Sequence, residues 1–375
     1  MTTDSRRRDE PSGRPARQAI LRGVAGKARF FHALVTSKIM RRTPPLFLYW
    51  FVTNRCNFRC SYCYGSFHSD QSPDLPTEVM LQMIDEMSHA GVKRVNLLGG
   101  EPLMRTDLGV LVDRLVSRKI SVCVLTNGSL LGQHFEEIEQ VDEVGLSIDG
   151  CEEIHDAIRG RGAFRALTRA IASLREKRIT VVLTYSMVVG NIQELDFVME
   201  FARRQGVYVT VNVAHGRVFG TEDVPVTRAS NDAYRAALQQ IIKYHERGYP
   251  VFRARRTLEL MLRWKDYHED TSEIPPTRDY PRCSFGSYAA TLTSDGTLIP
   301  CFLNSRGSAG LSVPEHGFSR AWQHCRQMAH CTYCHVPCFI EYNSILDLSL
   351  PVLLNAGMNL CVRPLFAKPR DLEAR

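Results

Sequence analysis

Six short apolar stretches alternate with amphipathic stretches between residues 46 and 213, and this alternation constrains the fold more than any other feature. The apolar stretches are rich in aliphatic and aromatic residues, which favour β-strands, whereas the stretches between them carry apolar residues at helical spacing. Such alternation predicts βαβ units and therefore a parallel sheet. The predicted strands are 46–53, 94–98, 120–126, 144–148, 180–187 and 207–213, and the predicted helices between them are 77–90, 106–118, 130–139, 163–177 and 192–205.

Three cysteines follow the first predicted strand with the spacing CxxxCxxC: Cys56, Cys60 and Cys63. They therefore lie on the loop that leaves the C-terminal end of that strand. Soft thiolates at this spacing suit an iron–sulfur cluster. Three ligands leave one iron of a four-iron cubane open for a substrate or cofactor. A tetrahedral zinc site is the alternative when the cysteines are considered alone.

A second motif, Gly99-Gly100-Glu101-Pro102, ends the second predicted strand. Its glycines let the backbone approach a ligand closely, and its glutamate can pair with an ammonium group. Together the two motifs resemble the radical SAM superfamily, which places an aromatic residue such as Tyr62 before its third cysteine and uses a GGEP motif to hold the amino group of S-adenosylmethionine (SAM). The resemblance implies a partial (β/α)6 TIM-like barrel and a SAM-binding [4Fe–4S] cluster, and it favours that cluster over zinc.

The resemblance also implies SAM contacts at the ends of the third and fourth strands, because chemistry in such barrels gathers at the C-terminal ends of the strands. In the SPASM and twitch subgroups, a serine and a downstream arginine contact the ribose and the carboxylate of SAM, and here Ser147 and Arg159 occupy the matching places. Asp149, Thr126 and Asn127 are further candidates for the same site. The alternatives are that Ser147 and Asp149 cap the next turn, and that Asn127 belongs to a simple turn.

A second group of cysteines lies in the C-terminal part of the sequence. Cys283 and Cys301 flank an Asp-Gly pair that predicts a hairpin between two extended runs. This arrangement resembles the opening of a SPASM or twitch domain, which implies a small cysteine-rich domain with one auxiliary [4Fe–4S] cluster; a zinc ribbon is the alternative. Phe302 stands where sulfatase-maturating members carry a catalytic aspartate, which argues against the same proton-accepting chemistry. The expected cluster ligands are Cys283, Cys301, Cys331 and Cys334, and Cys338 could replace one of them.

The charge and the distribution of cysteines indicate the compartment and the kinds of partner that are expected for the protein. No signal peptide is recognised at the N-terminus and the cysteines are clustered, so a reducing, cytoplasmic compartment is expected. No run is long enough to span a bilayer. The net charge is +7, and no Asp or Glu occurs from residue 11 to 69. We interpret residues 17–42 as a basic amphipathic helical segment that packs on the barrel or contacts the inner face of a membrane. Nucleic acid is not expected, because no recognised binding module accompanies the charge.

These features divide the sequence into six parts. The predicted parts are a disordered tail (1–16), the basic helical segment (17–45), the barrel (46–215), a helical bridge (216–280), the auxiliary-cluster domain (281–340) and a C-terminal tail (341–375).

The resemblance implies a function as well as a fold. It implies an oxidoreductase that cleaves SAM reductively to a 5′-deoxyadenosyl radical, which abstracts a hydrogen atom from the substrate, with a flavodoxin- or ferredoxin-type protein as electron donor. The twitch-like spacing favours a small metabolite, such as a sugar or aminocyclitol, whose oxidation the auxiliary cluster assists. A ribosomally made peptide and a lipid are the alternative substrates. A non-enzymatic iron–sulfur electron carrier is a further alternative, but it would not need Gly99–Pro102.

Overall fold

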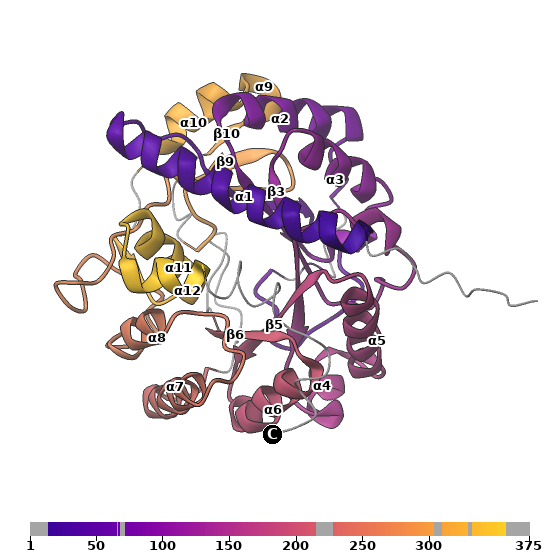
Figure 1. Ribbon diagram of the computed structural model, residues 1–375, viewed down its shortest axis with the longest axis vertical. Helices are drawn as coiled ribbons and strands as arrows, with labels where there is room; N and C mark the ends of the chain where they lie inside the picture. Colours follow the sequence, from indigo (N-terminus) through magenta and orange to yellow (C-terminus); the bar gives the residue numbers. More distant parts are fainter. Residues whose placement is uncertain are drawn as a thin grey trace, which may run out of the picture.

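The computed structural model describes residues 14–65, 67, 72–214, 228–303, 310–328 and 332–357. Six parallel strands form the core of its sheet, and each pairs with the next in sequence order. Helices follow the strands and surround the sheet on its outside (Figure 1). The predicted α/β fold with a partial TIM-like barrel is thereby confirmed. The strands are β1 (Phe47–Thr53), β2 (Arg94–Gly99), β3 (Ser121–Thr126), β4 (Glu143–Ile148), β5 (Thr180–Met187) and β6 (Tyr208–Val213).

Most of the outer helices bury one apolar face against the sheet. Helix α2 shows the pattern most simply, because four apolar residues at helical spacing are all buried: Met80, Met83, Ile84 and Met87. The sequence also explains where α2 ends, because Gly91 adopts a left-handed conformation (φ +103°) and caps the C-terminus of the helix. The helices of this layer are α2 (Thr77–Ala90), α3 (Leu108–Ser117), α4 (Glu152–Arg159), α5 (Ala163–Glu176) and α6 (Leu195–Gln205).

The connection between β3 and β4 differs from the prediction. Instead of a helix over 130–139, it consists of turns and one 3₁₀ turn, η2 (Glu136–Ile138). Gly128, with a left-handed backbone (φ +79°), and Gly132 both disfavour a regular helix there. Leu131 and Ile138 nevertheless remain in the core. The apolar spacing therefore predicts burial correctly, although the local geometry is not helical.

The sheet continues beyond the six parallel strands with C-terminal segments. Strand β8 (Ala289–Leu292) pairs in parallel with β1, and a tight turn leads to antiparallel β9 (Thr297–Ile299) and then to β10 (Leu311–Ser312). Gly296 has φ +82° in this turn, so the predicted Asp-Gly hairpin is present. The described part of the expected 281–340 domain is therefore joined to the barrel by a shared sheet rather than standing apart from it.

Helix α1 (Arg14–Ile39) covers much of the expected helical segment and lies across the barrel (Figure 1). It begins at Arg14, within the part expected to be a disordered tail (1–16). Gly26 of α1 faces Ser121, the first residue of β3, so the helix crosses the N-terminal ends of the strands. Its C-terminal half packs Leu34 against Leu46 and Leu346. Among the described helices, none is both long and apolar enough to cross a membrane.

The remaining described helices come from the C-terminal half of the sequence. The expected helical bridge contains α7 and α8, and Ser230 caps α7 by accepting a hydrogen bond from the N–H of Ala233 (3.2 Å). Helices α9 and α10 pack near α2, whereas α11 and α12 lie beside α1 and α8 (Figure 1). Their bounds are α7 (Asn231–Glu246), α8 (Arg255–Leu262), α9 (Val313–His316), α10 (Phe318–Gln327), α11 (Pro337–Leu346) and α12 (Leu350–Gly357).

Candidate functional site

The four predicted motif loops meet around one cavity of about 300 Å³ at the C-terminal ends of the strands. Cys56, Cys60 and Cys63 line one side of it, and all three thiols are half-buried. Residues from the ends of β2, β3, β4 and α4 form a further part of the wall, and residues of β5, β6 and the C-terminal segments line the rest. Of the expected cofactor residues, those that line the cavity are Tyr62, Gly99, Gly100, Thr126, Asn127, Ser147 and Arg159. Distant parts of the sequence are thus brought together as the motifs predict.

The three thiols fit a site for a cluster. All three are half-buried and line the same cavity of about 300 Å³. Three cysteines supply three of the four ligands of a cubane and leave one iron open.

The two glycines of the second motif bring strand β2 against the cysteine loop. A Cβ on Gly99 would lie 2.1 Å from the carbonyl oxygen of Thr53, and one on Gly100 would lie 2.2 Å from that of Arg55. The Gly100 N–H donates to Thr53 O (3.0 Å) and the Glu101 N–H donates to Arg55 O (2.8 Å). The glycines are therefore required first by a close approach between two segments of the protein, at the point where both reach the cavity.

Glu101 is turned into the protein rather than toward the cavity. Its side chain is 0% exposed and accepts three hydrogen bonds, from the hydroxyl of Thr126 (2.6 Å) and the N–H groups of Asn127 (2.7 Å) and Leu103 (3.1 Å). Burial raises the pKa of this carboxyl group, and the hydrogen bonds oppose the shift. The motif implies pairing with the ammonium group of SAM, whereas the described contacts tie the loop after β2 to the loop after β3. These contacts hold the carboxylate of Glu101 in place, and its pairing with the amino group of SAM stays a prediction.

We predict that Glu101→Gln weakens SAM binding indirectly. The amide can accept from Thr126 and Leu103, but its NH2 group then faces the N–H of Asn127, and a buried donor left without an acceptor costs about 1–3 kcal/mol. The free energy of unfolding in urea should fall by this amount, and SAM affinity, measured by equilibrium binding, should fall with it. Glu176→Gln, on an exposed site at the end of α5, is the matched control. Unchanged stability together with unchanged SAM affinity would remove Glu101 from the site.

Arg159 joins three of the predicted residues in one network. It binds the buried carboxylate of Asp149 and donates to the hydroxyl of Tyr62 (2.7 Å), which in turn donates to Asp149 (2.6 Å). Its Nη1 also lies 3.6 Å from Sγ of Cys60. Burial raises the pKa of the Cys60 thiol, and the guanidinium opposes that shift, so Arg159 favours the thiolate form. Asp149 does not line the cavity; it holds Arg159 against the cysteine loop.

The second cysteine group lies in a compact apolar cluster next to the first. Cys283, Cys301 and Cys334 share this cluster with several aromatic residues, and the N–H of Cys283 donates to the carbonyl oxygen of Thr332 (2.9 Å). The expected ligand Cys331 lies outside the described residues. Cys338 packs on the same cluster but also lines the barrel cavity that holds the first three cysteines.

Phe302 occupies the wall between the two cysteine groups. Its ring contacts those of Tyr49 (5.8 Å between centroids), Phe51 (5.6 Å) and Tyr64 (6.4 Å), and it lines the cavity. An apolar ring at this position offers no group that could accept a proton.

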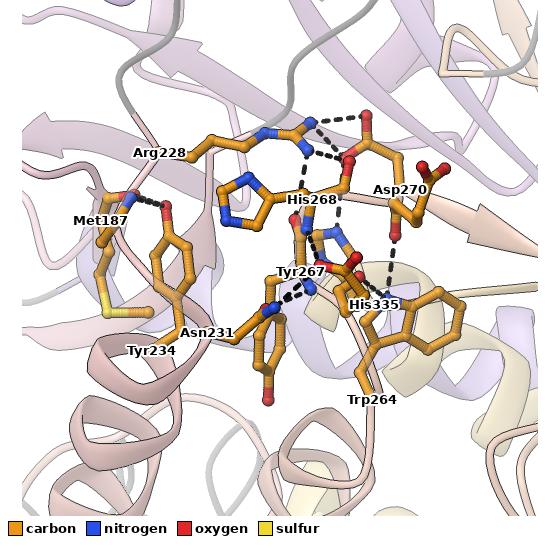
Figure 2. A network of polar contacts seen from close by, with 12 residues as sticks. Met187, Arg228, Asn231, Tyr234, Trp264, Tyr267, His268, Asp270 and His335 are labelled. Carbon is orange, nitrogen blue, oxygen red and sulfur yellow. Dashed lines mark hydrogen bonds and ion pairs between the residues drawn. The ribbon is translucent and has the colours of Figure 1, made fainter.

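A polar network that sequence reasoning missed holds the segment of Cys334 in place (Figure 2). Strand β11 (Tyr333–Cys334) pairs with β7 (Thr271–Ser272), and Asp270 immediately precedes β7. Arg228 donates to both carboxylate oxygens of Asp270 (2.9 and 3.0 Å), and Nε2 of His335 lies 3.4 Å from Asp270. His335 is fully buried between the rings of Trp264 and Tyr267. The sequence around Asp270 is charged and contains prolines, a composition that predicts only a boundary between domains.

We predict that Asp270→Asn destabilises the protein and loosens the segment of Cys334. The Arg228 and Asp270 side chains are only 9% and 13% exposed, so removing the carboxylate leaves a largely buried guanidinium without its partner, at a cost of about 3 kcal/mol. Urea unfolding measures the cost, and the iron retained after desalting should fall. Asp232→Asn is the control, because that side chain is 98% exposed and pairs only at the surface. Unchanged unfolding and iron content in Asp270→Asn would contradict this role.

Comparison with known proteins gives a family match over the barrel. The family model described as the Radical SAM superfamily matches residues 50–204. Among curated proteins, the protein is 28% identical over 212 residues to Fe-coproporphyrin III synthase of Methanosarcina barkeri, which is 54% of this chain and 53% of that protein. It is 33% identical over 172 residues to mycofactocin maturase MftC of Mycolicibacterium smegmatis (43% of each) and 27% identical over 258 residues to the sporulation killing factor maturation protein SkfB of Bacillus subtilis (67% and 59%). The matches thus span about half the length of these curated relatives.

Solved structures share the fold at lower sequence identity. SuiB of Streptococcus suis bound to its precursor peptide SuiA superposes with a TM-score of 0.61 at 16% identity, covering 79% of this chain and 70% of SuiB. The protein anSMEcpe with bound AdoMet and the Cp18Cys peptide gives a TM-score of 0.60 at 13% identity, covering 84% of this chain and all of that one. At these identities the likeness concerns the fold alone.

Proposed function

We propose, from the premise that the protein belongs to the radical SAM superfamily through residues 50–204, that it removes a hydrogen atom from a peptide substrate by using SAM. The observation that carries this proposal is the convergence of the three cysteines and the loops after β2, β3 and β4 on one cavity. SAM and a [4Fe–4S] cluster are the cofactors of this family, and together they supply a 5′-deoxyadenosyl radical after transfer of one electron. The protein itself must bind, orient and shield these groups.

Different residues of the cavity would bind the cluster and different parts of SAM. Cys56, Cys60 and Cys63 would hold three irons and leave the fourth open to SAM. Ser147 presents a hydroxyl to the cavity, which suits a ribose. Arg159 is bound by Asp149 and Tyr62, so its primary task is to hold the Cys60 loop, and contact with the carboxylate of SAM would use only its cavity-facing edge.

The cavity also offers the apolar shielding that radical chemistry requires. Aromatic and aliphatic side chains make up much of its wall, among them Phe58, Phe67, Leu98, Leu125 and Phe302. None of these five carries a polar group that could quench a reactive intermediate. We propose further that Cys283, Cys301, Cys331 and Cys334 hold an auxiliary cluster that accepts an electron from the substrate, and that a flavodoxin- or ferredoxin-type protein supplies the first electron.

A peptide is the substrate class that the relatives favour. Two curated relatives are named as maturation proteins or maturases, and two solved structures of the same fold hold peptides. The sugar or aminocyclitol that the twitch-like spacing favours gains no support from the relatives named above. Fe-coproporphyrin III synthase is also similar to this protein, so a tetrapyrrole is the second candidate.

The proposal is tested with the anaerobically reconstituted protein, SAM and a reductant. Short peptides encoded beside the gene form one arm, and an iron tetrapyrrole that is a precursor of Fe-coproporphyrin III forms the other. A peptide substrate should change mass in proportion to the 5′-deoxyadenosine formed, and a deuterated peptide should transfer deuterium into it. Mass change of the tetrapyrrole alone would select the second candidate. Failure of the reconstituted protein to cleave SAM at all would overturn the proposed function.

A further inference from the structure

The interior of the barrel extends from the cysteine site toward helix α1. The cavity of about 300 Å³ at the cysteines adjoins a second cavity of about 130 Å³ that α1 partly encloses. Both are lined by the same central group of residues: Tyr49, Asn96, Glu143, Phe252, Arg253 and Cys338. A molecule reaching inward from the cysteine site would therefore meet these side chains.

Arg253 is held at this boundary by an extended segment beside β6. The N–H of Val209 donates to the carbonyl oxygen of Pro250 (2.9 Å), and the N–H of Phe252 donates to that of Val209 (2.8 Å). Nε of Arg253 donates to the hydroxyl of Thr210 (3.0 Å), and the guanidinium lies 5.2 Å from the centroid of the Phe252 ring. These contacts fix the stem and one edge of the guanidinium, and Arg253 lines both cavities.

Arg253 differs from two other arginines around the barrel interior in how its charge is paired. Arg94 pairs with Glu143 (3.4 Å) and Arg159 pairs with Asp149. For Arg253, no carboxylate oxygen of the described residues lies within 4.0 Å of its nitrogens. A guanidinium carries five donors in a planar fork that matches a carboxylate.

The carboxylate of Glu341 lines the second cavity and interacts with the charge of Arg253 at longer range, but its hydrogen bonds go to other groups. It accepts hydrogen bonds from the N–H of Ala254 (3.2 and 3.3 Å) and from the hydroxyl of Thr257. Glu341 does not line the cavity at the cysteines. The carboxylate of Glu143 lines both cavities, but it is paired with Arg94 (3.4 Å). An anionic ligand that enters from the cysteine side can therefore reach Arg253 without displacing a carboxylate that is hydrogen-bonded to it.

Asn96 supplies a second, independent sign of a ligand. The residue is only 7% exposed and lines both cavities, and its Oδ1 atom is buried without a hydrogen-bond partner in the described structure. A buried amide oxygen without a donor costs free energy unless a ligand satisfies it. An N–H group of the substrate is the natural partner for such an acceptor.

We propose that Arg253 binds a carboxylate of the substrate inside the barrel while Asn96 accepts a hydrogen bond from an adjacent amide N–H. The ligand is thus a peptide segment with a free carboxylate, supplied either by an acidic side chain or by the C-terminus of the peptide. This inference rests on the proposed function, because it places the substrate beside the three-cysteine site. It adds the group by which the substrate is recognised and oriented.

The test uses two isomeric probes that separate the sources of the carboxylate. N-acetylisoglutamine carries only the side-chain carboxylate, N-acetylglutamine carries only the α-carboxylate, and N-acetylglutamine amide carries neither. Binding of each to the reconstituted, SAM-loaded full-length protein is measured by ligand-detected NMR titration without reductant. We expect one or both acids to bind and the diamide not to bind. Preference for N-acetylisoglutamine assigns an acidic side chain, and preference for N-acetylglutamine assigns a C-terminus.

Variants then locate the binding at Arg253. Arg253→Gln should weaken acid binding at least about tenfold, as expected for the loss of a charged hydrogen-bond pair. Arg253→Lys, which keeps the charge and loses the fork, should lie between Arg253→Gln and the native protein. Arg247→Gln removes the same charge from an exposed site on the same segment and should bind like the native protein. Circular dichroism confirms folding of each variant.

The inference and the proposed function fail in different ways. Failure of SAM cleavage by the native protein overturns the proposed function and leaves probe binding unaffected. If neither acid binds the native protein, if the diamide binds equally well, or if a folded Arg253→Gln protein binds the acids like the native one, the carboxylate site is overturned while SAM cleavage stands.

Discussion

Replacement of Cys56, Cys60 and Cys63 by alanine is expected to abolish SAM cleavage and to lower the iron content from about eight to about four atoms per protein molecule. The three thiols lie on one wall of the main cavity, and the sequence offers no other cysteine triplet on the loop after β1. Without them, SAM has no open iron to bind. Iron is measured colorimetrically after anaerobic reconstitution, and 5′-deoxyadenosine is measured by chromatography with dithionite as reductant.

The matched control for this variant is Cys151→Ala, which removes a half-buried thiol at the start of α4. It should keep both the iron content and the cleavage of SAM. A native iron content of about four, or a protein that retains only zinc, would contradict the assignment of two cubanes. Residual SAM cleavage in the triple variant would remove these cysteines from the site.

The double replacement Cys331→Ala/Cys334→Ala is expected to separate the two halves of the reaction. The three cysteines of the main cavity are untouched, so 5′-deoxyadenosine should still form with a chemical reductant. The oxidised product should be lost, because the second cluster would no longer be present to accept the electron of the substrate. Product is quantified by mass spectrometry beside 5′-deoxyadenosine in the same samples.

Structural damage could imitate this result, because Cys334 lies in strand β11 within a buried cluster. Circular dichroism and urea unfolding of the variant therefore accompany the assay. Cys325→Ala is the control, since it removes a fully buried thiol from α10, which lies away from the apolar cluster of the second cysteine group. Full product formation by a folded variant without the second cluster would make that cluster structural and favour a redox-neutral reaction.

The fold and the location of the site could be predicted because both depend on local patterns. The six strands are visible as apolar runs, and a parallel arrangement then brings their C-terminal ends together. Placement of Ser147 and Thr126 beside the cysteine loop follows from that rule alone. The helix predicted over 130–139 was wrong because apolar spacing reports burial, whereas the glycines of that segment decide its backbone.

The orientation of individual side chains could not be predicted in the same way. Glu101 follows the two glycines as the motif requires, yet its carboxylate is directed at the backbone of Asn127. Arg159 reaches Tyr62 across 97 residues of sequence, and Arg228 reaches Asp270 across 42. Such contacts depend on tertiary packing, and the alternation of residue types along the sequence does not predict them. The pairing of β8 with β1 was missed for the same reason.

That pairing has a consequence for how the protein is synthesised. Strand β1 is the first strand of the sheet, and all seven of its residues are buried. One of its edges pairs with β2, about forty residues later in the sequence. The other edge pairs with β8, in which Ala289 lies opposite Phe47. During synthesis, most of the barrel can therefore leave the ribosome while an apolar strand edge is still open.

An open, apolar edge invites pairing with another molecule. Pairing across so large a sequence separation also slows folding, because the intervening loop must close first. A protein cut before residue 289 should thus aggregate even though it retains the whole of the three-cysteine motif, and chaperone demand should be greatest just before the β8–β9 hairpin emerges. The β8–β9 hairpin, which leads to Cys301, therefore also covers the open edge of β1.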